Sequence, residues 1–187
     1  MGARLSHRFE DGLTFAARLH ATQTRKGTDI PYIAHLLAVS SLVITHGGDE
    51  DEAIAGLLHD AVEDQGGRPI LERIRARFGE RVAVIVNGCT DTDVTPKPPW
   101  RERKERYISH LKAASPSVKL VAAADKLDNV RAIIADYRMH GASLWSRFNA
   151  GKEEQQWFYR GCVTALAGGS QSLIGELDAV VQQLERL

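Results

Sequence analysis

The sequence predicts an all-α fold, a single helical bundle of about eight to nine helices. Apolar residues recur at spacings of three and four along almost the whole chain, and strict alternation of apolar and polar residues is nearly absent. Glycine pairs and one proline-rich segment divide this pattern into stretches of helical length. Because no internal repeat or low-complexity segment interrupts it, we expect one domain over residues 1–187.

Helices with one apolar stripe make up most of the predicted bundle. They are expected over 6–23, 32–46, 69–78, 82–86, 150–167 and 171–186. The helix expected over 100–113 is polar and strongly charged. Two more helices have a recognisable start. Asp49 or Asp51 can cap a helix that runs a little beyond Asp60, and Ser115 or Ser117 can cap a long one that runs through Ile134.

The segment 91–99 is the one clear loop, because it holds three of the six prolines. It lies beside the strongly charged helix predicted at 100–113. We therefore expect the loop to close over a bound ligand, and an unchanged KM after its deletion would contradict this.

Composition excludes several classes of function. Lysine plus arginine and aspartate plus glutamate number 24 each, so no overall charge favours nucleic acid or a membrane surface. The longest apolar runs fall far short of the roughly 20 residues that span a bilayer, and no signal peptide is recognisable. Cys89 and Cys162 are interpreted as reduced thiols. We expect a soluble cytoplasmic protein in which an oligomer is possible but not indicated.

The pair His59-Asp60 ends an apolar run and places two metal-capable groups at the end of a core helix. Glu63 and Asp64 follow these residues at a spacing of four, so each pair shares a face if the helix continues. Burying three carboxylates and an imidazole without a cation is unfavourable. The alternative interpretation is a solvated helix end with an acidic patch.

His35 and Asp125 are polar residues within apolar helical stretches. A lone histidine such as His35 is more often a core residue bonded to a carbonyl than a metal ligand. Asp125 follows a run of alanines in the long helix and needs a partner if it is buried. The next residue, Lys126, points about 100° away around the helix. A metal ion would satisfy Asp125.

Two imidazoles and two carboxylates form a mixed nitrogen and oxygen ligand set. The set predicted here is His35, His59, Asp60 and Asp125. It suits Mn²⁺, Fe²⁺ or Zn²⁺, with positions left for water. Such a metal lowers the pKa of bound water, and Glu63 and Asp64 would orient that water and transfer protons.

Groups that can bind a phosphorylated small molecule are also present. Arg25 and Lys26 follow the first helix, although considered alone they are better explained as a C-terminal cap that interacts favourably with the helix dipole. Asn129 lies four residues after Asp125, hence on the same helix face, and Lys126 is adjacent. We expect a phosphorylated small molecule as the partner of such a site.

Three segments together form a specific pattern. They are Arg25-Lys26 with 31–35, then 57–64, and then 124–129. Their order and spacing resemble the HD-type hydrolase domain of RelA/SpoT enzymes, and nothing here looks like a synthetase domain. The chain therefore resembles the stand-alone small alarmone hydrolases, which include the metazoan SpoT homologue.

This resemblance implies an all-helical HD phosphohydrolase that binds one Mn²⁺ through His35, His59, Asp60 and Asp125. Glu63 and Asp64 would be essential for hydrolysis. The implied reaction removes the 3′-pyrophosphate of guanosine 3′,5′-bis(pyrophosphate) or its pentaphosphate, giving GDP or GTP plus pyrophosphate. Arg25 and Lys26 would contact the base and its surroundings, and Asn129 the ribose.

The chain also departs from the family pattern. No serine follows Lys26, and Leu36 stands where many members have proline. Both positions lie on the nucleobase side of the site, so the choice between guanine and adenine stays open. Lys152, and Lys97 or Arg103, are candidates for contacts to the 5′-phosphates.

Other functions stay open at this point. An HD phosphohydrolase for another nucleotide, such as an adenosine alarmone or NADPH, would use the same metal ligands. A non-catalytic nucleotide-binding module is the second alternative. It gives no physical reason to keep the repelling carboxylates of Glu63 and Asp64. A helical interaction protein without a metal would leave Asp125 unexplained.

Overall fold

Helices account for nearly all regular structure in the computed structural model, which describes residues 4–92, 94 and 96–187. Within these residues there is one isolated bridge, between Thr24 and Pro31. The elements are α1 (His7–Leu19), α2 (Ile33–Thr45), α3 (Glu50–Leu58), α4 (Ala61–Gln65), α5 (Arg68–Phe78), α6 (Glu80–Cys89), α7 (Trp100–Ala113), α8 (Pro116–His140), the 3₁₀ helix η1 (Gly141–Arg147), α9 (Lys152–Ala165) and α10 (Gln171–Glu185). The predicted all-α fold class is confirmed.

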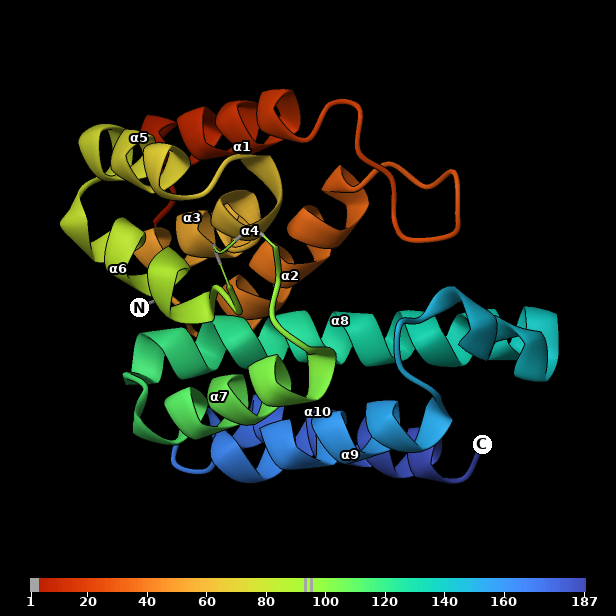
Figure 1. Cartoon of the computed structure of the whole chain (residues 1–187). Coiled ribbons are helices and arrows are strands. Elements are labelled where there is room, and N and C mark those ends of the chain that lie inside the picture. Colours follow the sequence, from red (N-terminus) through yellow and green to blue (C-terminus); the bar gives the residue numbers. More distant parts are fainter. Residues whose placement is uncertain (1–3, 93, 95) are drawn as a thin grey trace.

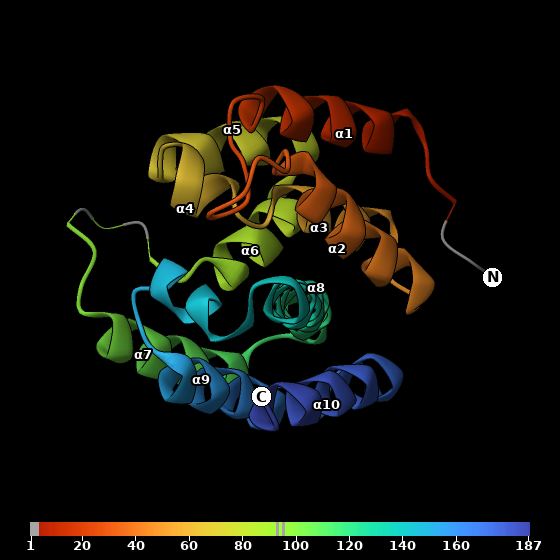
Figure 2. The same cartoon turned by 90° about the vertical axis from the view of Figure 1, so that its right-hand side faces the viewer.

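The long helix α8 runs through the middle of the molecule, and the other helices lie on either side of it (Figures 1 and 2). Helices α2, α3 and α6 pack on one side of α8, and α9 and α10 pack on the other. Because α8 is covered from both sides, buried residues occur around much of its circumference. The polar residues Asp125 and Lys126 therefore lie inside the protein.

The helix expected to run from Asp49 past Asp60 is divided in two. Its start is as predicted: the Asp49 side chain accepts from the backbone N–H of Glu52, and the Glu52 side chain accepts from that of Asp49, a capping box. The helix ends at Leu58, and α4 begins at Ala61. This break adds one helix to the nine segments expected and leaves His59 and Asp60 at the junction.

Helices α2 and α3 approach closely because a glycine lies between them. A Cβ atom at Gly56 would lie 3.1 Å from the Cα of Ser40, tighter than almost all real contacts. The Ser40 hydroxyl also donates to the carbonyl of Ala53 at 2.9 Å. This close packing brings the first turn of α2 to the end of α3.

The second half of the chain differs from expectation mainly in length. Ser115, the first of the two predicted caps, accepts from the backbone N–H of Val118. Helix α8 then continues to His140, and Gly141 ends it with φ +60°. The 3₁₀ helix that follows was not expected. None of the helices in the described residues is long and apolar enough to cross a membrane.

Candidate metal centre and nucleotide pocket

The structure brings the predicted metal ligands together from three parts of the chain. His35 comes from α2, His59 and Asp60 from the α3–α4 junction, and Asp125 from α8. The Nε2 atom of His35 lies 3.3 Å from that of His59 and 3.4 Å from Asp125 Oδ1. Asp60 Oδ2 lies 3.1 Å from His59 Nε2 and 3.6 Å from His35 Nε2. Both histidines and Asp125 are buried, and Asp60 is half-buried.

These separations fit a divalent ion. Ligands about 2.0–2.2 Å from a metal, at tetrahedral or octahedral angles, lie about 2.8–3.6 Å from one another. The separations that involve the two Nε2 atoms are 3.1–3.7 Å, at or just above this range. His35, His59 and Asp125 offer ligand atoms that all lie within 4.8 Å of one another, and Asp60 approaches this group from the side of the two histidines. The donors are imidazole nitrogens and carboxylate oxygens, which suit a hard-to-borderline divalent ion.

Each imidazole is oriented by its second nitrogen. His59 Nδ1 donates to the backbone carbonyl of Gly56 at 2.9 Å, and His35 Nδ1 donates to Asp128 Oδ2 at 2.6 Å. Both Nε2 atoms are then left with a lone pair directed into the cluster. Asp128 had no predicted role. Its spacing of three from Asp125 was the available signal, because such residues share a helix face.

The charges of the cluster are strongly coupled. Burial lowers the pKa of His35, but hydrogen bonds to the carboxylates of Asp125, Asp128 and Asp60 outweigh it and raise the pKa to about 9. Burial raises the pKa of Asp60 and Asp125. Nearby positive groups, His59 for Asp60 and Lys126 for Asp125, outweigh burial and hold both values well below the usual range. The metal-free cluster thus holds protons that a divalent ion would displace.

Lys126 lies where the sequence analysis did not place it. Its Nζ donates to Asp125 Oδ2 at 2.5 Å, so the expectation that Lys126 points away from Asp125 is wrong. The flexible stem of lysine folds back along the helix, although the Cα–Cβ bond starts in another direction. The ammonium is buried 4.8 Å from the ring centroid of Tyr107. Lys126 supports Asp125 and is absent from the lining of the second cavity described below.

Glu63 and Asp64 lie on α4 and line one cavity of about 460 Å³ together with Lys97. Lys97 Nζ lies 2.7 Å from Glu63 Oε1, and Gln23 donates to Asp64 Oδ2 at 2.8 Å. Surrounding protein and the nearby negative charge of Asp60 raise the pKa of Asp64 to about 6, although part of its side chain reaches solvent. The pair therefore faces open space beside the ligand cluster.

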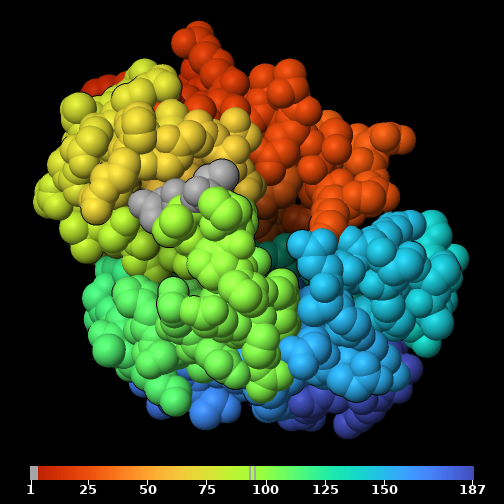
Figure 3. All heavy atoms as spheres, in the orientation of Figure 1, coloured from red at the N-terminus to blue at the C-terminus, as the bar shows by residue number. Residues whose placement is uncertain are grey.

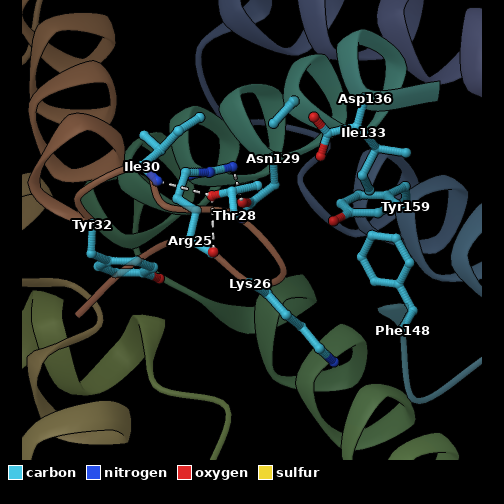
Figure 4. A pocket seen from close by; sticks show the side chains of 11 residues that line it. Arg25, Lys26, Thr28, Ile30, Tyr32, Asn129, Ile133, Asp136, Phe148 and Tyr159 are labelled. Carbon is cyan, nitrogen blue, oxygen red and sulfur yellow. Dashed lines mark hydrogen bonds between the residues drawn. The ribbon is translucent and has the colours of Figure 1, made fainter. Parts of the chain in front are cut away.

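A second cavity, of about 190 Å³, lies between the loop before α2 and helix α8. Its lining residues are Arg25, Lys26, Thr28, Ile30, Tyr32, Asn129, Ala132, Ile133, Asp136, Phe148 and Tyr159. Figure 3 shows the surface hollowed where the orange, green and light blue parts of the chain meet. In Figure 4, Arg25 and Asn129 lie together, with Phe148 and Tyr159 opposite them.

The structure places Arg25, Lys26 and Asn129, three of the predicted substrate residues, at this cavity. Arg25 Nη1 donates to Asp128 Oδ2 at 3.1 Å, and its Nη2 donates to Asn129 Oδ1 at 3.2 Å. Lys26 Nζ donates to the side-chain oxygen of Asn149 at 3.2 Å.

Tyr32 links the cavity to the ligand cluster. It lines the cavity, and its hydroxyl donates to Asp60 Oδ2 at 2.5 Å. Tyr32 belongs to the motif at 31–35, but no role was predicted for it.

The remaining candidates are further away or already paired. Lys152 is the first residue of α9 and is not among the residues that line the described cavities. Arg103 is bonded to the carboxylate of Asp91, and both side chains are largely buried. Of the loop 91–99, residues 93 and 95 lie outside the described part of the chain. That the loop closes over a ligand stays a prediction.

Comparison with known proteins identifies the relatives of this chain. Residues 12–155 match the family model of the HD domain. The guanosine-3′,5′-bis(diphosphate) 3′-pyrophosphohydrolase MESH1 of Xenopus tropicalis is 37% identical over 171 residues, which is 90% of this chain and 89% of that protein. The MESH1 of Drosophila melanogaster is 31% identical over 183 residues and 95% of both chains.

A solved structure agrees with these matches. It is described as a metazoan orthologue of SpoT that hydrolyses ppGpp, and it is 28% identical with a TM-score of 0.81 over 100% of both chains. The resemblance carried by three short sequence segments is therefore confirmed over the length of the molecule. The chain belongs to the HD-domain family, among relatives that include the stand-alone MESH1 proteins.

Proposed function

We propose that the protein is a metal-dependent hydrolase that removes the 3′-pyrophosphate of guanosine 3′,5′-bis(diphosphate), giving GDP and pyrophosphate. The observation that carries this proposal is the position of the ligand cluster. It lies near the carboxylate pair of α4 and is joined by Tyr32 to a cavity with basic residues. The related MESH1 proteins carry the name of this activity.

His35, His59, Asp60 and Asp125 would hold one divalent ion, for which we propose Mn²⁺. When bound, such an ion supplies a Lewis acid that stabilises negative charge developing on phosphate oxygens. Asp128, Tyr32 and Lys126 would fix the orientation of the ligand side chains through the hydrogen bonds described above. Because ligands come from α2 and α8, we also propose that residues 1–187 act as a single domain.

Glu63 and Asp64 would orient the attacking water and transfer its proton. A carboxylate whose pKa is near 6 is mostly ionised at neutral pH, yet it is a stronger base than an ordinary aspartate. Lys97 holds Glu63 by an ion pair and would also attract the leaving pyrophosphate. Asp64 would thus accept the proton, and Glu63 would position the water.

The cavity beside Asn129 would hold the nucleoside. Arg25 and Lys26 present positive charge on one side, and Phe148 and Tyr159 present aromatic rings for a base to stack on. Lys126 is not proposed as a substrate contact, because its ammonium is buried against Asp125.

The proposal is tested by pyrophosphate release from a panel of nucleotides. The panel holds the guanosine and adenosine tetra- and pentaphosphates, with orthophosphate release from NADPH assayed in parallel. We expect release from the guanosine compounds, lost in the Glu63→Ala/Asp64→Ala variant and kept in Asp178→Asn on the surface of α10. Turnover of only adenosine compounds or NADPH would agree with the proposed metal centre but contradict the proposed guanosine substrate. No turnover with Mn²⁺ bound would favour a non-catalytic binding module.

A further inference from the structure

Arg25 is connected to two of the proposed metal ligands by short hydrogen-bonded paths. Its Nη1 donates to Asp128 Oδ2 at 3.1 Å, and the same oxygen accepts from His35 Nδ1 at 2.6 Å. Its Nη2 donates to Asn129 Oδ1 at 3.2 Å, and Asn129 Nδ2 donates to Asp125 Oδ1 at 2.5 Å. The two paths start at one guanidinium in the cavity and end at two different ligands.

The path through Asp128 is largely shielded from water. The side chains of Arg25 and Asp128 are 17% and 22% exposed, and that of His35 is fully buried. A charge-assisted hydrogen bond is stronger in such surroundings than at an open surface. Because one oxygen of Asp128 serves both partners, a weaker bond to one of them strengthens the bond to the other.

We propose that Asp128 and Asn129 couple the nucleotide cavity to the metal ligands, so that a nucleoside held by Arg25 tightens metal binding. This inference rests on the proposed function, because it takes the four-residue cluster as a metal centre. A ligand that draws the Arg25 guanidinium away from Asp128 leaves the carboxylate of Asp128 hydrogen-bonded to His35. This stronger hydrogen bond makes His35 a better metal ligand. By linkage, the metal must tighten nucleoside binding by the same factor.

The coupling can be measured with Mn²⁺ alone, without any turnover. The Mn²⁺ affinity of the full chain is determined by competition with a chelator in a double-mutant cycle. Asp128→Asn should weaken binding by about 10–100-fold, because His35 loses a charged acceptor. Arg25→Gln should tighten binding by about fivefold or more. In the Asp128→Asn background, Arg25→Gln should have a much smaller effect, because the shared oxygen is no longer charged.

A matched control comes from the same helix and the same cavity. Asp136 lines the cavity on α8 and pairs with Arg147 at 3.6 Å, and neither residue contacts the ligand cluster in the structure. Asp136→Asn should therefore leave the Mn²⁺ affinity unchanged. If Asp128→Asn does not fold, Asn129→Ser takes its place in the cycle. This substitution removes the hydrogen-bonded path from Arg25 through Asn129 to Asp125.

Guanosine provides a further probe, since it has no phosphate that could bind the metal directly. Saturating guanosine should tighten Mn²⁺ binding to the wild type but not to Arg25→Gln. Additive effects in the cycle, or an unchanged affinity in Arg25→Gln, would overturn the coupling. Non-additive effects in a protein that does not hydrolyse guanosine tetraphosphate would keep the coupling and overturn the proposed function. Hydrolysis of guanosine tetraphosphate together with additive effects in the cycle would keep the proposed function and overturn the coupling.

Discussion

The Nε2 atoms of His35 and His59 lie 3.3 Å apart, and the Nδ1 of each ring is already bonded to another acceptor. Two imidazoles held in this way direct both Nε2 atoms at the same point, which protons occupy in the metal-free protein and where a divalent ion would displace them. The close approach of α2 and α3 at Gly56 creates this relationship. It is therefore a property of the packing as well as of the two histidines.

Replacing Gly56 by alanine should disturb both packing and metal binding. The new Cβ would lie 3.1 Å from Ser40 Cα, so α2 and α3 must separate. We expect a loss of about 1–3 kcal/mol in the free energy of unfolding, measured in urea. The Mn²⁺ affinity should fall as well, because His35 moves away from His59.

Gly175→Ala on α10 is the matched control. No atom lies within 4 Å of a Cβ at Gly175. Alanine should stabilise the protein there by about 0.5–1 kcal/mol, because glycine is unfavourable inside a helix. Equal effects of the two substitutions would contradict the packing argument.

Lys126→Met should strongly destabilise the metal-free protein. It leaves the buried carboxylate of Asp125 without its ammonium partner, a change that typically costs about 3–5 kcal/mol. Methionine keeps an apolar stem against Tyr107, so the effect reports the charge. Urea unfolding with and without Mn²⁺ should show partial recovery by the ion. Lys112→Met, on the exposed face of α7, should change stability little, and a similar loss there would refute this account.

Tyr32→Phe should weaken metal binding and leave the fold intact. The substitution removes only the hydroxyl that holds Asp60 Oδ2 at 2.5 Å. Loss of such a supporting hydrogen bond usually lowers metal affinity about 10–100-fold. Titration of the stripped protein with Mn²⁺ measures the change. Tyr137→Phe, which removes a 3.4 Å bond to the carbonyl of Leu187, is the control and should bind Mn²⁺ as the wild type does.

Asp64→Asn should abolish hydrolysis but make the metal-free protein more stable above neutral pH. The pKa of Asp64 is about 6 in the folded state and 3.8 for an ordinary, unperturbed aspartate, so ionised Asp64 favours the unfolded chain. Protonated Asp64 contributes to the free energy of unfolding. This contribution is complete below pH 3.8 and is lost as the pH rises through about 6.

Because the Asp64 side chain reaches solvent, screening limits the expected gain to at most about 1 kcal/mol. Thermal unfolding at pH 4 and pH 8 measures it. A variant that is no more stable than the wild type at pH 8 would show that the carboxylate is not strained in the folded state.

Much of the fold and of the ligand set could be predicted from sequence. Helical spacing is a local property, so the helix that carries His35 was identified with nearly correct boundaries, and the start of the helix that carries Asp125 was identified correctly. The break after Leu58 was not predicted, because the apolar run continues into a stretch that also suits a helix. Only packing against neighbouring helices shows that His59 and Asp60 lie at a junction.

Side-chain partners were the hardest to predict. Sequence spacing directs the Cα–Cβ bond of Lys126 away from Asp125 around the helix axis. The long side chain of Lys126 nevertheless bends back, so that its ammonium contacts the carboxylate of Asp125. Asp128 was overlooked because its partners, His35 and Arg25, lie about 90–100 positions earlier in the chain. Such contacts depend on tertiary packing, which no local pattern contains.

Restoring the metal to stripped protein is the most direct test of the central claim. Pyrophosphate release from guanosine 3′,5′-bis(diphosphate) would be followed before and after Mn²⁺ is added, for the wild type and for His59→Ala. We predict release only from the wild type and only with Mn²⁺, at one bound ion per chain. Equal release without any metal, or from His59→Ala, would contradict the account.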